Sequence, residues 1–295
     1  MDSDAESDFY GSEETIAALN FRLNSHTISS LWITHQASRS LLPRPNDALP
    51  PPPGALHNHF PNAEDRLSAR QLDETVDAFL ARLPPATTDI APGLDWIWIA
   101  NPYIPPPDPK SRPLVGAFNT RGRALLDSLT AFIAANSRPT DGKSPFVAQR
   151  AIAKQREDTV QSLHDLAVEC NLLSGKWMLF PQPGDVDAVW ARVARATANN
   201  ELGQMAKVAT RTANSAEPRL ICVYTKDYRD KEDVARVLRR LRELGLVRDG
   251  EKRIYYKTDG WTNLGIYGGN DWNIKASLYS SNDIFAYIKQ HGSRR

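Results

Sequence analysis

The chain of 295 residues has little cysteine and no long hydrophobic run. Its two cysteines, Cys170 and Cys222, are too few for a disulfide framework, and Cys222 lies in the apolar stretch 220–223, where a thiol behaves as a small hydrophobic group. No segment reaches the roughly eighteen uncharged apolar residues that a membrane-spanning helix needs. The acidic start, residues 1–6, is unlike a signal or transit peptide. We therefore expect a soluble protein of the cytoplasm or the nucleus, with no membrane partner.

The sequence also lacks the short motifs of common enzymes. It contains no Gly-x-Ser-x-Gly element, no P-loop and no dinucleotide glycine fingerprint after a strand. His57 and His59 lie in a proline-rich segment without partner cysteines, and the other four histidines show no metal-ligand spacing. Asp227, Asp259 and Asp271 follow strands or lie in loops, where a carboxylate usually caps a turn but also suits an acid or a metal ligand. We predict no catalytic residue, no metal site and no cofactor.

The formal net charge of +1 conceals a charge gradient along the chain. Residues 146–295 hold 24 of the 36 Lys and Arg residues and 18 of the 35 Asp and Glu residues, a net of +6 against −5 for the rest. This polarity favours an approach of the C-terminal half to a polyanion. The simpler alternative is that the excess only aids solubility.

The first sixty-six residues are expected to stand apart from the folded body. Residues 1–14 contain six acids and no base, which favours a disordered tail. The prolines of 43–53 exclude a helix or a central strand and indicate a polyproline II spacer. We therefore predict a partly disordered acidic tail and Pro-rich linker over 1–66. The remainder, 67–295, is predicted to be a single domain with a helical insert at about 113–172.

Three helices and a strand are expected in the first half of that domain. Apolar residues recur with helical spacing over 68–83, where Leu72, Val76, Phe79 and Leu80 share one side. The alternating, aromatic segment 95–100 is typical of a strand. Helical patterns follow over about 113–136 and 144–172.

The second half shows the mixed pattern of an α+β fold. Asp185 and Asp230 are predicted as N-caps of two amphipathic helices, and Gly245 as the residue that ends the second one. Short apolar or alternating segments predict strands over 176–180, 205–210, 219–225, 253–257, 264–267 and 277–281. The order β-α-β-β-α-β-β-β with short connections favours a curved antiparallel sheet backed by helices.

Several of these segments resemble known families. Trp177-Met178-Leu179-Phe180, a proline/glycine turn and 185–190 look like the second strand and first helix of translation initiation factor 4E, and 219–246 resembles its late strand and last long helix. The whole chain is more similar still to the basophilic-leukaemia-expressed proteins, a poorly characterised eukaryotic family with this fold. The shared features are Gly175-Lys176-Trp177, Ala206-Lys207-Val208, Tyr224-Thr225 with Asp227, Tyr256-Lys257 with Asp259, and Leu264-Gly265-Ile266-Tyr267.

The resemblance to the initiation factor, over about 96–279, implies some binding residues and not others. That factor holds a methylated guanine between two tryptophans, reads it with a glutamate and binds the phosphates with basic residues. Here the segment 198–204 has no aromatic residue, so classical cap binding is not expected. The phosphate contacts implied by the resemblance fall around Lys207, Arg211 and Lys226.

The residues themselves suggest a cationic and aromatic surface. Alternation places Lys207 on one strand face with Met205 and Ala209, where it either meets a phosphate or is simply solvated. Lys257 lies in a similar strand, and Tyr224, Trp261 and Trp272 would offer rings on which bases stack. The alternative for these aromatics is burial in the core, which we expect for Trp177 and Trp190.

Three functional hypotheses follow. The first is a non-catalytic protein that binds RNA or a nucleotide through a set of predicted contact residues, namely Lys207, Arg211, Tyr224, Lys226, Lys257, Trp261 and Trp272. The second is a protein–protein interaction module that uses the Pro-rich linker, the acidic tail or the arginines of 236–242. The third is an unrecognised enzyme acting on a phosphorylated small molecule, which requires a pocket with a perturbed acid beside Lys207.

Overall fold

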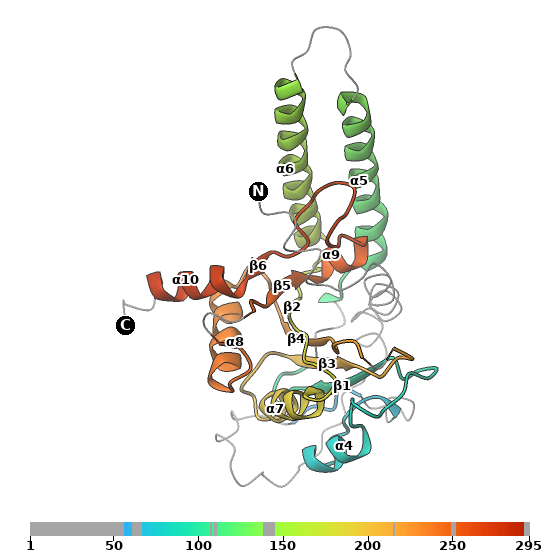
Figure 1. Cartoon of the computed structure of the whole chain (residues 1–295), viewed down its shortest axis with the longest axis vertical. Helices are drawn as coiled ribbons and strands as arrows, with labels where there is room; N and C mark the ends of the chain where they lie inside the picture. The colour runs from blue at the N-terminus through green and yellow to red at the C-terminus, as the bar shows by residue number, and fades with distance from the viewer. Residues whose placement is uncertain are drawn as a thin grey trace. The chain divides into compact units, whose positions relative to one another are not determined.

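The computed structural model describes residues 56–60, 67–106, 108, 111–137, 145–214, 216–248 and 252–291 (Figure 1). Apart from 56–60, the tail and linker predicted over 1–66 lie outside the described residues. The described residues divide into two compact units. We call them the sheet unit (within 56–110, 174–258 and 277–291) and the helical unit (within 111–173 and 259–276).

The sheet unit is built on an open sheet of six strands in the order β1-β3-β4-β2-β5-β6 (Figure 1). Every neighbouring pair is antiparallel. The strands are β1 (Trp96–Ala100), β2 (Gly175–Leu179), β3 (Met205–Ala209), β4 (Ile221–Thr225), β5 (Tyr255–Thr258) and β6 (Tyr279–Ser280). With the seven helices of the described residues, this confirms the predicted α+β class.

One face of this sheet is aliphatic and aromatic and carries helices. Helix α7 (Val186–Ala198) packs against β1 and β3, and α8 (Lys231–Glu243) packs against β4. Trp177 lies on this face, because its cross-strand neighbours are Val223 and Tyr256, and its indole N–H donates to the carbonyl of Val234 in α8 at 3.1 Å. Trp177 is fully buried, as predicted.

The capping predictions for α8 are confirmed, and the one for α7 is confirmed in position but not in the side-chain bond. The carboxylate of Asp230 accepts a hydrogen bond from the backbone N–H of Asp233, and Gly245 follows the helix with φ +69°. Both features satisfy backbone groups that a helix end leaves open. Asp185 occupies the N-cap position of α7, but its side chain makes no capping bond because its own backbone is already helical (φ −106°, ψ −11°).

The helix predicted over 68–83 is shorter in the structure. Helix α4 spans only Val76–Arg82 and is capped by the Thr75 hydroxyl. The preceding residues instead extend the sheet: the Trp98 N–H donates to the Ser68 carbonyl, and the Arg70 N–H to the Trp98 carbonyl. The helical pattern predicted the wrong structure for these residues, because the backbone groups of Ser68 and Arg70 bond to the outer edge of β1 and not within a helix.

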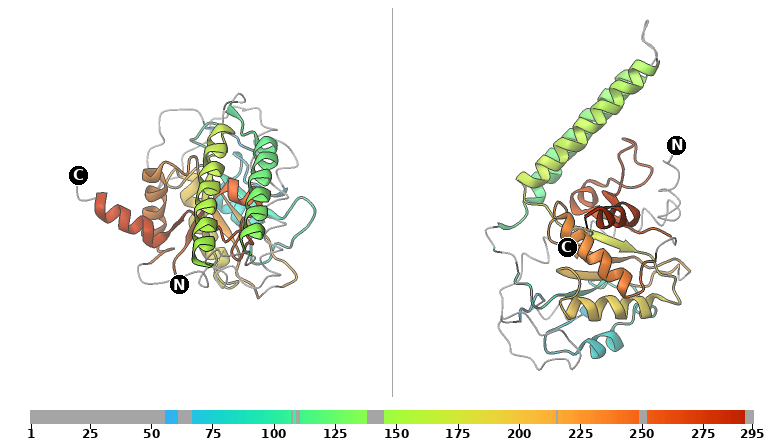
Figure 2. Two further views of the ribbon diagram at one scale, coloured as in Figure 1. Left: turned by 90° about the horizontal axis from the view of Figure 1, so that it is seen from above. Right: turned by 90° about the vertical axis from the view of Figure 1, so that its left-hand side faces the viewer.

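The helical unit contains a hairpin of two long helices, α5 (Val115–Ser137) and α6 (Pro145–Glu169), which run side by side (Figure 2). Both fall within the segment predicted to be a helical insert. The unit also contains α9 (Asp259–Leu264). Gly122 of α5 approaches this helix closely, since a Cβ there would lie 2.8 Å from Leu264 Cδ2. No described helix is long and apolar enough to cross a membrane.

The strand predicted over 264–267 is wrong. Leu264 ends α9, and Gly265 follows with φ +71°, so that the N–H groups of Gly265 and Ile266 bond back to Thr262 and Trp261. This is a helix end stabilised by a glycine, which apolar composition alone does not distinguish from a strand. A last helix of the sheet unit, α10 (Ser281–His291), was not predicted either.

Candidate functional site

The face of the sheet opposite to Trp177 carries lysines among aromatic rings. Residues directly opposite each other in antiparallel strands point to the same side, so the register defines this face. Its first cross-strand row is Ala100–Met205–Tyr224–Lys176–Lys257, and its second is Trp98–Lys207–Cys222–Met178–Tyr255. Trp96, two residues before Trp98, shares the face. We call this surface, from β1 to β5, the lysine face.

Lys207 lies inside a cage of aromatic rings. Its Nζ is 3.9 Å from the ring centroid of Trp96, 4.7 Å from that of Trp98 and 5.9 Å from that of Tyr224. The rings of Trp98 and Tyr224 are nearly parallel, with centroids 6.3 Å apart. The negative face of an aromatic ring attracts an ammonium group, by about 2 kcal/mol or more when water is excluded. The prediction that Lys207 shares a face with Met205 is therefore confirmed, and the alternative of a solvated lysine is excluded by its 1% exposure.

Lys176 and Lys257 are directly opposite each other on β2 and β5. Side chains in such a pair have Cβ atoms roughly 5 Å apart. Lys176 also lies next to Tyr224, with its Nζ 5.7 Å from the ring centroid. Like charges in opposed positions repel, so negative charge nearby would stabilise this pair. The arrangement suits one anion with several oxygens, held by both ammonium groups.

All three lysines of this face are also buried. Lys176, Lys207 and Lys257 are each only 1% exposed. The effective cost of removing an ion from water is several kcal/mol, unless opposite charge or hydrogen bonds replace the lost hydration. Three lysines on one face of one small sheet therefore need such compensation, and each of the three has at least one interacting partner in the structure.

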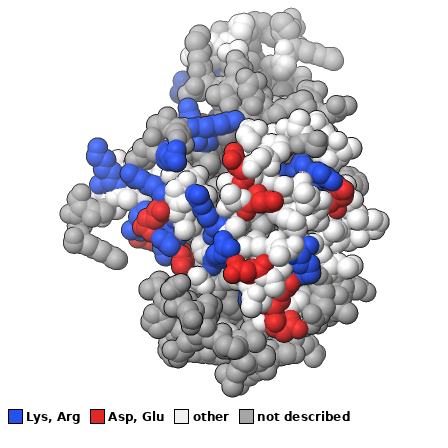
Figure 3. All heavy atoms as spheres, turned by 60° about the horizontal axis from the view of Figure 1, so that its bottom comes forward, with Lys and Arg blue, Asp and Glu red and all other residues white. Residues whose placement is uncertain are grey.

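Two predicted contact residues lie outside the lysine face. Arg211 follows β3 and forms a bidentate ion pair with Asp89, whose carboxylate oxygens lie 2.6 and 3.0 Å from its nitrogens. This hydrogen bonding raises the pKa of Arg211 and lowers that of Asp89. Lys226, one residue beyond β4, is exposed. Ion pairs of this kind are spread over the surface, where basic and acidic side chains lie next to each other (Figure 3).

The two predicted tryptophans belong to the helical unit and are held by contacts within it. Trp261 in α9 is buried; its indole N–H donates to the Lys275 carbonyl at 3.2 Å and its ring stacks on that of His164. The Trp272 indole N–H donates to the Thr130 hydroxyl at 2.8 Å, and its carbonyl accepts from Arg156 Nε. Both rings therefore have a structural role in the helical unit. Of the seven predicted residues, Lys207, Tyr224 and Lys257 are brought together on one face.

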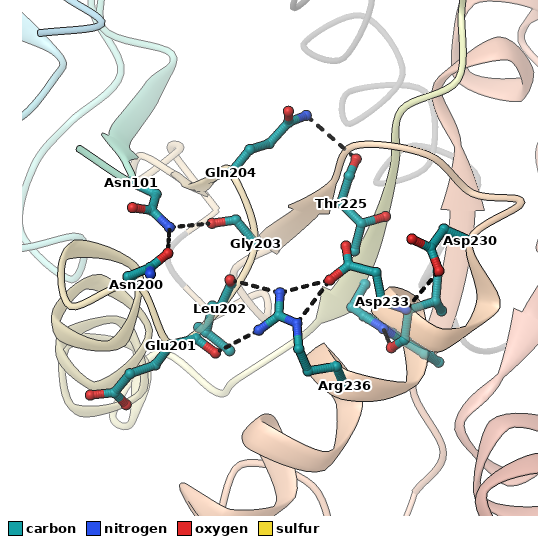
Figure 4. A network of polar contacts seen from close by, with 12 residues as sticks. Asn101, Asn200, Glu201, Leu202, Gly203, Gln204, Thr225, Asp230, Asp233 and Arg236 are labelled. Carbon is teal, nitrogen blue, oxygen red and sulfur yellow. Dashed lines mark hydrogen bonds and ion pairs between the residues drawn. The ribbon is translucent and has the colours of Figure 1, made fainter. Parts of the chain in front are cut away.

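The segment that lacks an aromatic residue, 198–204, is a polar link inside the sheet unit (Figure 4). The guanidinium of Arg236 in α8 donates to the carbonyls of Glu201 and Leu202. The Asn101 side chain, after β1, donates to Asn200 Oδ1 and to the Gly203 carbonyl. The polar groups of this segment thus join the ends of β1 and β4 to α8.

A pocket of about 490 Å³ lies between α5 and α6. Its charged lining consists of Arg121, Asp165 and Glu169, and Arg121 is already bound to Glu169 through two hydrogen bonds of 2.5 and 2.8 Å. The net negative charge of this lining suits a phosphate poorly. Among the residues that the structure describes, no group of three or more His, Cys, Asp and Glu side chains is arranged to hold a metal ion.

Sequence reasoning missed Lys176, Trp96 and Trp98 as members of the site. The signal for Lys176 was present, because the alternation in β2 places Lys176 and Met178 on the side opposite to Trp177. The pairing of Lys176 with Lys257 requires the strand order β4-β2-β5, which separates strands that are consecutive in the sequence.

A comparison with protein-family models complements this geometry. The model described as basophilic leukemia-expressed protein Bles03 matches residues 19–265. The match covers most of the chain, including all of β1 to β5, and therefore contains every residue of the lysine face.

Proposed function

The chain belongs to the family of basophilic leukemia-expressed protein Bles03, and we propose that it is a non-catalytic protein of the cytoplasm or nucleus that binds RNA or a nucleotide on the lysine face. The ligand's phosphates meet the ammonium groups of Lys176 and Lys257, and Tyr224 offers the adjacent ring. In this proposal the sheet binds a phosphate-containing ligand, as the resemblance of the sequence to translation initiation factor 4E implies.

The observation that carries the proposal is the direct opposition of Lys176 and Lys257. A phosphate or pyrophosphate group presents several charged oxygens within a few ångströms, which matches two ammonium groups on neighbouring strands. Sequence-tolerant binding of nucleic acids combines such cations with aromatic rings on which bases stack. The lysine face has both components in one cross-strand row, where Tyr224 is next to Lys176.

Lys207 has a different role in this proposal. Its ammonium group is enclosed by three rings, so it orders the aromatic part of the face more than it contacts phosphate. The exposed Lys226 adds a long-range attraction that any polyanion would feel.

Salt-dependent binding of a labelled single-stranded oligoribonucleotide tests the proposal. The full chain is compared with Lys176→Met/Lys257→Met, which removes both charges at nearly constant side-chain volume. Two lost phosphate contacts should weaken binding strongly and reduce the slope of log K against log salt by about 0.7 each. Lys252→Met/Lys289→Met, which removes two exposed lysines outside the face, is the matched control and should change binding much less.

Thermal melting of each variant separates loss of the ligand site from loss of the fold. Inorganic pyrophosphate and a nucleoside triphosphate, used as competitors, distinguish a nucleotide site from one that needs an RNA chain. Equal affinities and salt slopes for wild type and the folded double variant would refute the proposal.

The interaction-module alternative is weakened by the arginines on which it partly depended. Arg236 binds two backbone carbonyls, and Arg240 forms ion pairs with Glu201 and Glu243. These side chains therefore attach α8 to the segment 199–204. A pull-down whose protein partners survive nuclease treatment would favour this alternative over RNA binding.

A further inference from the structure

Arg219 is a buried arginine whose guanidinium has no hydrogen bond or ion pair with any residue that the structure describes. The residue is only 3% exposed, and its Nε is buried without a hydrogen-bond acceptor. A charged donor that is removed from water and left without an acceptor destabilises the folded state. Other arginines of the sheet unit are paired with acids, as Arg211 is with Asp89 and Arg240 with Glu201. An anion bound at Arg219 would supply the missing acceptor.

Arg219 lies just before β4, on the side of the sheet opposite to the lysine face. Its backbone N–H donates to the Pro181 carbonyl at 3.0 Å, so the pairing of β4 with β2 continues to this residue. Side chains alternate along a strand, and Arg219 therefore shares a side with Ile221 and Val223. Val223 is the cross-strand neighbour of Trp177, which defines the helix-covered side. A ligand of Arg219 would thus bind separately from one on the lysine face.

The charges around Arg219 do not compensate its own. Burial lowers the pKa of Arg219 and the charge of Arg211 lowers it further, whereas Glu217 and Asp89 act in the opposite direction. Neither acid bonds to Arg219. Asp89 is held by Arg211 through two hydrogen bonds, and Glu217 accepts one from the Asn214 side chain at 2.7 Å. Two guanidinium groups therefore lie near each other, and only that of Arg211 is bonded to a carboxylate.

This arrangement suits a carboxylate better than a phosphate. A guanidinium forms two parallel N–H···O bonds with a planar carboxylate, which carries a single charge. A phosphate monoester carries close to two negative charges at pH 7, and the nearby Asp89 and Glu217 would repel the second one. Because so little of Arg219 reaches solvent, a small molecule fits the site better than a macromolecular surface does.

We propose that Arg219 binds the carboxylate group of a small organic anion, at a site separate from the lysine face. Arg211 adds positive potential there without contacting the ligand, because Asp89 already occupies its guanidinium. This site requires neither RNA nor a nucleotide, so the inference goes beyond the proposed function.

Thermal melting of the full chain with acetate as the probe tests the site. The melting temperature should rise with acetate concentration at constant ionic strength, because a ligand of the folded state stabilises it. Arg219→Met removes the charge and keeps an apolar side chain of similar length. It should weaken acetate binding by about tenfold or more, since hydrogen bonds between charged groups are lost. Arg239→Met, which changes an exposed arginine of α8, is the matched control and should respond to acetate as wild type does.

The melting temperature without acetate gives a second, independent readout. Arg219→Met should then melt no lower than wild type, because it removes a buried charge that has no acceptor in the absence of the ligand. A markedly lower value would show that the guanidinium is satisfied within the chain, and this would overturn the inference. Equal acetate responses of wild type and Arg219→Met would overturn it as well.

Nuclear magnetic resonance locates the bound anion. The Nε–H signal of Arg219, identified by its absence from the spectrum of Arg219→Met, should shift as acetate replaces chloride. Binding of acetate without any change at this signal would place the anion elsewhere and refute the assignment to Arg219.

An acid variant and a second anion test the class of ligand. Asp89→Asn removes one of the two competing negative charges and should bind acetate more tightly, whereas Asp127→Asn, an exposed acid of the helical unit, should leave the affinity unchanged. Equal affinities of the two variants would contradict the role of the neighbouring charges. Stronger protection by inorganic phosphate than by acetate would overturn the assignment to a carboxylate.

Discussion

The ammonium group of Lys207 lies 3.9 Å from the ring centroid of Trp96, and both side chains are 1% exposed. The ammonium group of a lysine side chain thus occupies an aromatic cage of the kind that other proteins use for cationic ligands. The cage is filled by a lysine of the sheet itself, so in the proposed function Lys176 and Lys257, and not Lys207, contact the phosphate.

A double-mutant cycle should measure the strength of this contact. Lys207→Met, Trp96→Leu and the combined variant are compared by urea unfolding. We expect a favourable coupling energy of about 1–2 kcal/mol, because Trp96 stabilises the charged side chain and not its apolar replacement. A coupling energy near zero would show that the ring and the cation are neighbours without a stabilising interaction.

The close approach of Gly203 to β4 predicts a large effect of a single methyl group. A Cβ at Gly203 would lie 1.8 Å from the backbone carbonyl oxygen of Tyr224, which cannot move without distorting the sheet. We expect Gly203→Ala to lower the free energy of unfolding by about 3 kcal/mol or more. Gly184→Ala is the matched control, since a Cβ there meets nothing within 4 Å, and should change stability by less than about 0.5 kcal/mol. Similar melting temperatures for the two variants would contradict this account.

The guanidinium of Arg236 should contribute measurably to stability although it is partly exposed. Arg236→Met removes the hydrogen bonds to the carbonyls of Glu201 and Leu202 and should cost about 1–2 kcal/mol. Arg239→Met, an exposed residue of the same helix, should be close to neutral. Chemical unfolding of both variants measures the difference. Equal losses in the free energy of unfolding would show that removal of the positive charge, and not of the hydrogen bonds, destabilises the protein.

His164 should make the helical unit less stable in mild acid. Burial of the ring against Trp261 lowers the pKa of His164, and the charge of Asp165 opposes this only in part. As the pH falls, the unfolded state therefore takes up a proton at His164 before the folded state does. The contribution of neutral His164 to the free energy of unfolding is thus fully present above about pH 6.5 and decreases as the pH falls below that value.

Unfolding at pH 7.5 and pH 5.5 measures this dependence. In His164→Gln, which cannot take up the proton, the loss of stability between the two values should be smaller than in wild type. An identical loss in both proteins would assign the pH dependence to other groups.

The local rules predicted the pieces of the sheet unit well. The alternation of 205–209 correctly gave the side on which Lys207 lies, and Asp230 and Gly245 correctly marked the ends of α8, because each signal depends on neighbouring residues only. They failed where a distant partner decided the outcome. Residues 68–70 became an edge of the sheet only because β1 was available to pair with them.

The candidate site shows the same limit. The cationic character of Lys207 and Lys257 was evident in the sequence, but the opposition of Lys257 to Lys176 results from β2 lying between β4 and β5. Trp261 was expected to stack a base, yet its own unit uses the ring against His164 and the indole N–H at Lys275. A ring's sequence context does not indicate which side chain will cover it.

The pairing of Ser68 and Arg70 with Trp98 has a consequence for the protein in concentrated solution. Strand β1 forms one margin of the sheet, and its residues Trp96–Ala100 are all buried and apolar. An uncovered margin of this composition would recruit strands from other molecules. Because the short segment around Ala69 already pairs with the backbone N–H and carbonyl of Trp98, proteolysis just after Arg70 should increase self-association through β1.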